Sequence, residues 1–157
     1  MNIILRKTTD EDLETLFLYQ TDEESNQMAA FTSENPNDRN AYFDKWLKII
    51  INPKINMQTI IHDNLIVGSV LHFDMMSETN VSYWIGRKHW GNGIATMALK
   101  LFIEQVNKRP LFGRVAYDNF GSQKVLVNCG FKTIGEEYGF ANAREKEIKE
   151  FLYKLEK

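Results

Sequence analysis

The N-terminal part of the chain begins with an extended segment and a helix whose hydrophobic residues share one side. Residues 3–6 are the extended segment. Thr8 and Thr9 stand three positions before Glu11 and Asp12, the pattern of a capping box at a helix start. The predicted helix buries the residues that recur at helical spacing, which are Leu13, Leu16, Phe17 and Tyr19.

Two more helical segments are indicated before residue 56. Residues 22–30 fit either a short helix or a loop, and the turn-rich stretch 32–38 follows. Asn37 or Asp38 then caps a longer helix, which Asn52 and Pro53 end. Its apolar residues recur at helical spacing and are Tyr42, Phe43, Trp46, Leu47 and Ile50.

From residue 56 the hydrophobic pattern changes to that of β-strands. Residues 57–62 and 65–75 are β-rich runs separated only by Asp63 and Asn64, which predicts a hairpin. A polar turn at 77–80 precedes a third strand over residues 81–85. This part of the chain therefore supplies neighbouring antiparallel strands.

A glycine-containing turn opens the next helix. The stretch 83–107 starts as an apolar strand, passes through basic residues, and continues from the turn without a helix breaker. Its few polar residues lie on one narrow stripe and are Lys100, Glu104, Asn107 and Lys108. We expect this helix to be mostly buried against the sheet.

The C-terminal third combines two strands, a short helix and an ambiguous tail. Strand 112–117 is followed by a helix that Asn119 caps and that ends at Cys129. Gly130 suits a left-handed residue at the helix end, and residues 131–134 resume extended structure. The Glu- and Lys-rich tail from Arg144 has high local helix propensity.

Composition indicates an ordinary globular protein. The 157 residues are enough for one domain, 1–157, and 43% of them are hydrophobic, yet no apolar run approaches the roughly 20 residues of a membrane span. The N-terminus lacks the pattern of a secretory signal, and one cysteine excludes an internal disulfide. We expect a cytoplasmic protein. The net charge of −2 argues against a nucleic-acid partner.

The turn at Gly91, Asn92 and Gly93 is a candidate anion site. Free amides at a helix start favour a phosphate, and residues without a Cβ atom let the backbone approach it. A P-loop would need Lys and Ser or Thr after its second glycine, and a dinucleotide loop would need Gly or Ala where Thr96 stands. Neither pattern fits, and a plain turn that binds nothing remains the alternative.

Two segments together resemble the GNAT superfamily of N-acetyltransferases. Trp90 to Ala95 resemble its pyrophosphate loop, Q/R-x-x-G-x-G/A, with Gly93 and Ala95 in the small positions. A second segment runs from Asn119 and Ser122 to Gly130-Phe131, and resembles the family's N-x-x-S/A start and closing G-F. The form WGNGIA is most similar to the branch of the ribosomal-protein N-terminal acetyltransferases.

Two departures from this pattern are plain. Trp90 stands where the superfamily has Gln or Arg, and Met97 stands where that branch usually has an acidic residue.

The resemblance implies an α+β fold with a mostly antiparallel, twisted sheet flanked by helices. At the centre of the sheet, two parallel strands splay apart, and acetyl-CoA lies between them. For the C-terminal tail it implies a last strand over residues 148–155 instead of a helix, and we adopt the strand.

The same resemblance implies which residues bind the cosubstrate. The backbone around Trp84 and Ile85 would pair with the pantetheine arm, and a backbone amide there would polarise the thioester carbonyl. Asn119 would bind the arm, and Ser122 would lie near the sulfur. The loop that would hold the pyrophosphate consists of Trp90, Gly91, Asn92, Gly93, Ile94, Ala95 and Thr96.

Acid–base residues are harder to assign. Many members of the family protonate the leaving thiolate with a Tyr where this chain has Leu126, which either leaves Ser122 as the candidate acid or lets the thiolate depart without an acid. No general base is evident among the loop and strand-end carboxylates, which are Glu34, Asp74, Glu78 and Glu137. The histidines lack a metal-binding spacing, and we expect no metal. Cys129 is expected to be a core residue, and Trp84 and Trp90 fit either cofactor contacts or structural roles.

The functional hypothesis is an acetyl-CoA-dependent N-acetyltransferase. It would transfer an acetyl group directly to a primary amine of a protein N-terminus or of a small molecule. A non-catalytic CoA-binding module is the alternative, because the usual acid and a base are missing. The sequence leaves the acceptor open, and a homodimer formed through edge strands is equally undecided.

Overall fold

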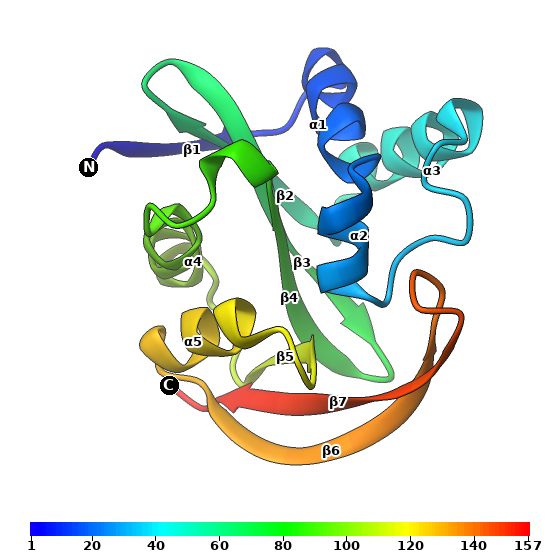
Figure 1. Ribbon diagram of the computed structural model, residues 1–157. Coiled ribbons are helices and arrows are strands. Elements are labelled where there is room, and N and C mark those ends of the chain that lie inside the picture. Colours follow the sequence, from blue (N-terminus) through cyan, green and yellow to red (C-terminus); the bar gives the residue numbers. More distant parts are fainter.

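A seven-stranded, strongly curved sheet forms the centre of the computed structural model, which describes residues 1–157 (Figure 1). The strand order is β1-β2-β3-β4-β5-β7-β6, and only β4 and β5 are parallel. The strands are β1 (Ile3–Lys7), β2 (Asn56–His62), β3 (Leu65–Met75), β4 (Glu78–Ile85), β5 (Leu111–Ala116), β6 (Lys132–Ala141) and β7 (Lys146–Leu155). The predicted mostly antiparallel sheet with one central parallel pair is confirmed.

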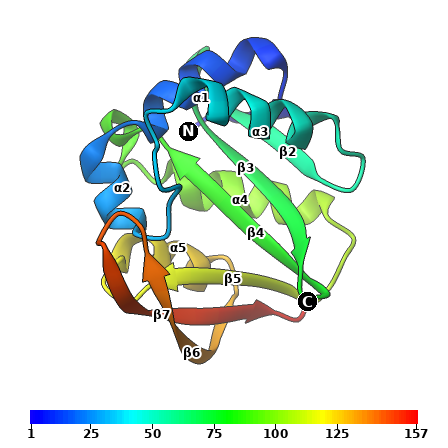
Figure 2. The ribbon, with the colours of Figure 1, turned by 90° about the vertical axis from the view of Figure 1, so that its right-hand side faces the viewer.

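Five α-helices flank the sheet on its two faces. They are α1 (Leu13–Gln20), α2 (Glu23–Ala29), α3 (Arg39–Ile51), α4 (Ile94–Gln105) and α5 (Phe120–Asn128), with short 3-10 turns η1 (Asp10–Asp12) and η2 (Arg87–His89). The first three helices cover one face, and α4 and α5 cover the other (Figures 1 and 2). No helix is both long and apolar enough to cross a bilayer.

Helix α4 supplies the centre of the main core. Ile94, Ala98, Leu99 and Phe102 are at most 2% exposed and follow one another at helical spacing. They pack against residues of β1, β3 and β4, as the hydrophobic pattern predicted. The helix ends at Gln105, so the prediction was wrong in placing Asn107 and Lys108 on its polar stripe.

Helix α3 is amphipathic but contains no fully buried residue. Asp38 caps it by accepting a 3.0 Å hydrogen bond from the Ala41 amide, which decides between the two predicted caps. Its hydrophobic side chains pack on a small second cluster built on Leu13, Leu16, Met57 and Leu71. Leu47 is 41% exposed and is not part of this cluster.

Tight turns with positive φ angles fix the two hairpins of the central sheet. Asp63 and Asn64 have φ values of 52° and 63°, as the predicted two-residue hairpin requires. Met76 and Ser77 form a second such turn with φ values of 53° and 65°, and β4 starts at Glu78. The predicted polar turn over 77–80 was therefore wrong, since Met76 and Ser77 are not among the Asn, Asp and Gly residues that usually adopt the positive φ angles of such a turn.

The segments left open by the sequence adopt regular structure. Residues 23–29 are helical, with Asp22 accepting a 3.0 Å hydrogen bond from the Ser25 amide. The C-terminal tail is strand β7, in which Ile148, Tyr153 and Leu155 are buried. Pairing with β5 and β6 on both sides outweighs its local helix propensity.

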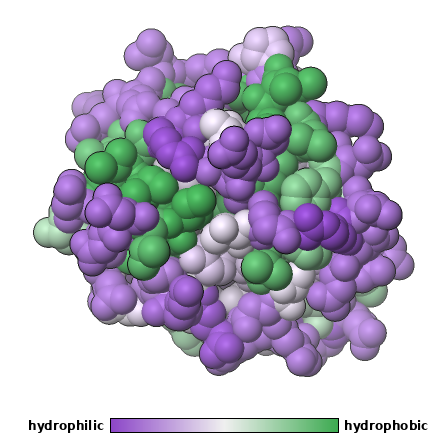
Figure 3. Space-filling view, turned by 90° about the horizontal axis from the view of Figure 1, so that it is seen from above, coloured by the Kyte–Doolittle hydropathy of each residue, from purple (hydrophilic) through white to green (hydrophobic).

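Viewed from above, the surface is mainly hydrophilic, with separate apolar areas (Figure 3).

A buried carboxylate ties the first helical turn to the sheet. Asp12 is 3% exposed and accepts hydrogen bonds from Arg6 at 2.6 and 2.7 Å, from the Thr9 amide and from Thr59. The Thr9–Asp12 capping box is thus confirmed. Burial acts to raise the pKa of the Asp12 carboxyl, but these hydrogen bonds hold it below its usual value.

We predict that Asp12→Asn lowers the free energy of unfolding by about 1–3 kcal/mol at neutral pH, because Arg6 and the capping box lose a charged acceptor. The folded-state pKa of Asp12 is lowered, so its stabilisation is lost as the pH falls through that value. The free energies of unfolding of the variant and the unmodified protein, measured with urea, should therefore become equal in acid. Asp10→Asn, at an exposed position of the same turn, is the control and should change little.

Candidate active site

Strands β4 and β5 separate after a very short stretch of parallel pairing. They pair only at Thr79↔Leu111 and Asn80↔Phe112, and then diverge (Figure 2). Beyond that point β4 remains paired with β3, while β5 remains paired with β7. The predicted splay is confirmed, and it leaves two strand edges facing each other across a gap.

The antiparallel ladder determines which main-chain groups of β4 face this gap. The Gly86 amide donates a 2.9 Å hydrogen bond to Val67 of the β3 side. The N–H and C=O groups of successive residues point to opposite sides of a strand. Trp84 therefore also points these groups toward β3, whereas Tyr83 and Ile85 point theirs toward the gap. The geometry therefore favours Ile85, together with Tyr83, over Trp84 for pairing with an extended ligand.

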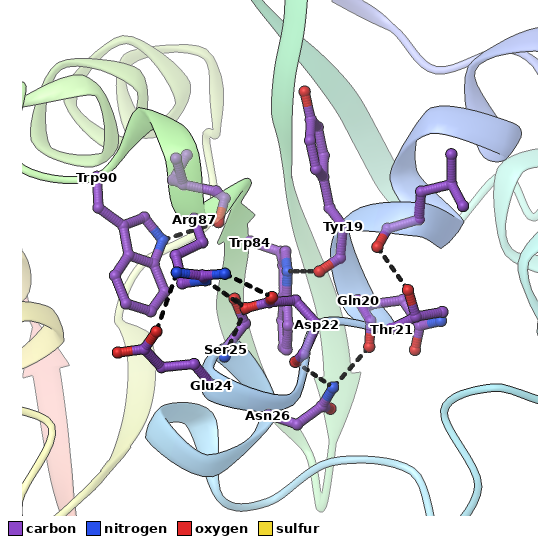
Figure 4. A network of polar contacts seen from close by, with 12 residues as sticks. Tyr19, Gln20, Thr21, Asp22, Glu24, Ser25, Asn26, Trp84, Arg87 and Trp90 are labelled. Atoms are coloured by element: carbon purple, nitrogen blue, oxygen red, sulfur yellow. Dashed lines mark hydrogen bonds and ion pairs between the residues drawn. The ribbon is translucent and has the colours of Figure 1, made fainter.

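Two tryptophan side chains hold the end of β4. The Trp90 indole donates a 2.9 Å hydrogen bond to the Ile85 carbonyl. The Trp84 indole lies toward α1, where it donates to the Tyr19 carbonyl at 3.3 Å (Figure 4). Trp90 therefore occupies one of the gap-facing groups of Ile85, and the Ile85 amide is the group that stays available.

The glycine turn after η2 is open to solvent and left-handed. Gly91 and Gly93 have φ values of 80° and 76°, and Gly93 is the N-cap of α4. A Cβ atom on Gly91 would meet nothing within 4 Å, and on Gly93 only the Met1 side chain at 3.8 Å. The turn therefore leaves room for a ligand close to its backbone.

The amides of residues 91–96 donate to no acceptor within the protein. The first helical hydrogen bond of α4 joins the Met97 amide to the Gly93 carbonyl at 3.1 Å, and no backbone or side-chain oxygen accepts from the amides before it. Ile94 is buried and anchors the helix start, while Ala95 and Thr96 are half-buried. Consecutive free amides at the positive end of a helix form an anion-binding site.

Helix α5 brings its first turn to the other side of the gap. The Asn119 side-chain oxygen accepts a 3.2 Å hydrogen bond from the Ser122 amide, which confirms the predicted cap. The Asn119 NH₂ group has no protein acceptor, so it is free for a ligand. The Ser122 hydroxyl forms a short hydrogen bond with the hydroxyl of Tyr83.

Tyr83 is a candidate site residue that the sequence interpretation missed. Burial raises the pKa of Tyr83 to about 12, although the hydrogen bond with Ser122 acts to lower it. The phenol is therefore protonated at neutral pH and can donate to Ser122. Its position two residues before Ile85, on the same alternating set of β4, is the signal that could have identified it.

The Leu126 side chain is packed in the core. Leu126 is 3% exposed, and a Cβ atom on Gly113 would lie 3.1 Å from its side chain. Cys129 is also in this core, and burial raises the pKa of its thiol, which keeps it protonated and unreactive.

A cavity of about 740 Å³ reaches the splay from the other face of the sheet. Of the four carboxylates considered as bases, Glu34 and Asp74 line it, and Glu78 and Glu137 do not. Asp74 accepts a 2.8 Å hydrogen bond from the Thr79 hydroxyl, which lowers the pKa of its carboxyl group. It also forms an ion pair with Lys108 at 3.4 Å. Glu34 is therefore the cavity carboxylate of this set without an ion pair.

Arg87 joins helix α2 to the turn before the glycine loop. Its guanidinium lies 2.8 Å from Asp22 and 3.0 Å from Glu24, and the hydrogen bond from Arg87 lowers the pKa of Asp22 to about 2 (Figure 4). Tyr19 packs on Gly86 just before this turn, where a Cβ atom would lie 2.6 Å from its ring. These contacts fix η2 beside the helical layer.

The acetyltransferase (GNAT) domain family model matches residues 2–132 of the chain. The comparison with curated protein sequences gives no match. The fold is similar to that of the microcin C7 self-immunity acetyltransferase MccE, with a TM-score of 0.82 at 19% identity over 99% of this chain and 92% of that one.

Two further solved structures share the fold. One is a ribosomal-protein-alanine N-acetyltransferase from Brucella melitensis, with a TM-score of 0.83 at 16% identity over 98% of this chain and 99% of that one. The other is RimJ from Mycobacterium smegmatis, with a TM-score of 0.78 at 15% identity over 98% and 81%.

We predict that Gly86→Ala lowers the free energy of unfolding by about 1–3 kcal/mol, because the added methyl group displaces the Tyr19 ring. Gly121→Ala is the matched control, since a Cβ atom there meets nothing closer than 4.0 Å and helix α5 gains a better helix former. In thermal or urea unfolding, the stability of the control should equal or exceed that of the unmodified protein. Equal stability of the two variants would contradict the packing argument.

Proposed function

Because this chain belongs to the GNAT acetyltransferase family, we propose that it transfers the acetyl group of acetyl-CoA directly to a primary amine. The observation that carries the proposal is the run of free amides at residues 91–96 next to the splayed edges of β4 and β5. The structure of MccE is a complex with acetyl-CoA and AMP, and that of M. smegmatis RimJ is a complex with CoA-disulfide, which supports this cosubstrate.

The residues around the gap suit a long ligand with a diphosphate at one end. The amides of residues 91–96 would bind the diphosphate, which brings negative charge to the positive end of α4. The free main-chain groups of Tyr83 and Ile85, and the NH₂ group of Asn119, would bind the amides of the pantetheine arm. The Ile85 amide would stabilise negative charge on the thioester oxygen, a donor worth about 3 kcal/mol in comparable sites.

Proton transfer completes the proposed reaction. The amine nitrogen forms a bond to the acetyl carbon and releases its extra proton to solvent as the carbon–sulfur bond breaks, and the leaving thiolate takes the proton of the Ser122 hydroxyl. Tyr83 passes its proton to Ser122 through their hydrogen bond, and solvent returns a proton to Tyr83. The ammonium group of the acceptor must first lose a proton, and we assign its removal to Glu34, a carboxylate that lines the cavity.

The described chain, residues 1–157, would act as one acetyltransferase domain in the cytoplasm. A reducing compartment suits the single buried cysteine, Cys129. The acceptor would be a protein N-terminus or a small molecule. A ribosomal-protein-alanine acetyltransferase from B. melitensis is among the structural relatives, so a protein N-terminus is one of the two candidate classes.

A substitution in the glycine loop tests the proposed cosubstrate site. Gly93→Glu should weaken acetyl-CoA binding at least 100-fold, because a carboxylate at the left-handed cap repels the diphosphate and covers the amides. Isothermal titration calorimetry measures the affinity, and circular dichroism verifies the fold. Gly135→Glu adds the same side chain at an exposed strand position with open space and should bind normally. Unchanged affinity of Gly93→Glu would refute the proposed cosubstrate site.

Removal of the Ser122 hydroxyl tests its proposed role as the acid that protonates the leaving thiolate. Ser122→Ala should lower kcat at least tenfold while changing the affinity for CoA less than threefold, because the hydroxyl acts on the leaving thiolate. Tyr83→Phe should lower kcat less, since Ser122 keeps its own proton. Thiol release measures kcat. Equal kcat for Ser122→Ala and the unmodified protein would exclude Ser122 as the acid.

A non-catalytic CoA-binding module is the second candidate function. The buried Leu126, where many members of the family have a Tyr acid, is the observation that favours it. This candidate predicts tight CoA binding without thiol release for any of a broad panel of amines and peptides. Turnover with one acceptor would exclude it.

A further inference from the structure

The cavity on the α1–α3 face has an apolar wall and ends at the splay. Its volume of about 740 Å³ is in the range that accommodates a small organic ligand. The wall consists of residues from α1, α3, β2 and β3, among them Leu16, Tyr42, Trp46, Ile49, Met57 and Leu71. At the splay end, Ser69 and Ser82 line the cavity beside Tyr83 and Trp84. A ligand bound here therefore combines an apolar body with a polar group near the gap.

Two carboxamides in the lining have already used their donors within the protein. The Gln20 NH₂ group donates to the carbonyls of Phe17 at 3.1 Å and Pro36 at 2.6 Å. The Asn26 NH₂ group donates to the carbonyls of Gln20 at 2.7 Å and Asp22 at 2.9 Å (Figure 4). Main-chain carbonyls only accept hydrogen bonds, so both amide orientations are chemically fixed.

The carbonyl oxygens of these carboxamides are left as unpaired acceptors. No protein donor bonds to Gln20 Oε1 or Asn26 Oδ1, and Asn26 is 6% exposed. Both oxygens remain accessible to solvent, so a ligand donor would replace water at them. These two side chains can therefore accept hydrogen bonds from a ligand.

The charges around the cavity have the same preference. Three carboxylates line it, from Glu34, Asp38 and Asp74, against one ammonium group, from Lys45. The Lys45 ammonium lies 5.2 Å from the centre of the Trp46 ring. The cavity thus favours a cation and disfavours a carboxylate.

We infer that the acceptor is a hydrophobic amine: a primary ammonium on an apolar body, without an acidic group. An ammonium has three donors and no acceptor, which matches the unpaired oxygens. A peptide N-terminus would instead place its polar backbone against the apolar wall of Leu16, Ile49, Met57 and Leu71. This inference rests on the proposed acetyl transfer for its chemistry but not for its binding.

A matched pair of compounds tests the inference. Tryptamine and L-tryptophan differ only in the carboxylate, and a tripeptide Ala-Gly-Trp represents a protein N-terminus. With acetyl-CoA, we expect thiol release with a kcat/KM at least 30-fold higher for tryptamine than for either of the others. Preferred acetylation of the tripeptide or of tryptophan would overturn the inference while leaving acetyl transfer intact.

A binding measurement separates the two proposals. Calorimetry on the CoA-saturated protein should give tighter binding for tryptamine than for L-tryptophan. If tryptamine binds selectively and no compound is acetylated, the acceptor class stands and the proposed activity fails. If L-tryptophan or the tripeptide binds as tightly as tryptamine, the inference fails.

A charge reversal locates the effect in the cavity. Glu34→Lys should lower the ratio of tryptamine to L-tryptophan affinity about tenfold, because the net charge of the lining rises by two. Glu147→Lys makes the same change at an exposed position of β7 outside the cavity and should leave the ratio unchanged. Equal ratios for the two variants would show that the cavity charge does not select the ligand.

Discussion

The arrangement of the site depends on a competition between partners of the two central strands. Strand β4 pairs with β3 along its length, and β5 pairs with β7 along its length, whereas β4 and β5 share only two residue pairs. Each central strand therefore follows its outer, antiparallel neighbour, and the twist of the two halves carries the strands apart. The result is an unpaired strand edge in the interior of a sheet, which is an unusual place for free main-chain groups.

The surroundings of this gap reduce the cost of leaving it open. The Trp90 indole satisfies the Ile85 carbonyl, and the hydrogen bond between Tyr83 and Ser122 links β4 to α5 across it. The Leu126 side chain is buried in the core. Other unpaired donors lie at the glycine turn, whose residues 91–93 are exposed, so water can solvate them.

The two sides of the gap have opposite electrostatic character. On the α4 side, free amides at a helix start present positive partial charge. On the α1–α3 side, carboxylates and unpaired amide oxygens line the cavity. The proposed anionic carrier and cationic amine would therefore be drawn to opposite sides of the same opening, and their reactive ends would meet where the strands part.

The sequence alone determined the elements whose signals are contained within a few residues. Capping residues such as Thr9 and Asn119, the Asp63-Asn64 turn and the glycine loop identified helix starts, a hairpin and a candidate anion site, because each is a local hydrogen-bond or φ requirement. Only the tertiary structure decided the features that depend on distant contacts. The tail is a strand because β5 and β6 pair with it, Tyr83 reaches Ser122 across 39 positions, and Glu34 lines a cavity whose wall comes from α1, α3 and β3. Contacts between such distant residues are set by how the layers pack, which local propensity and spacing do not specify.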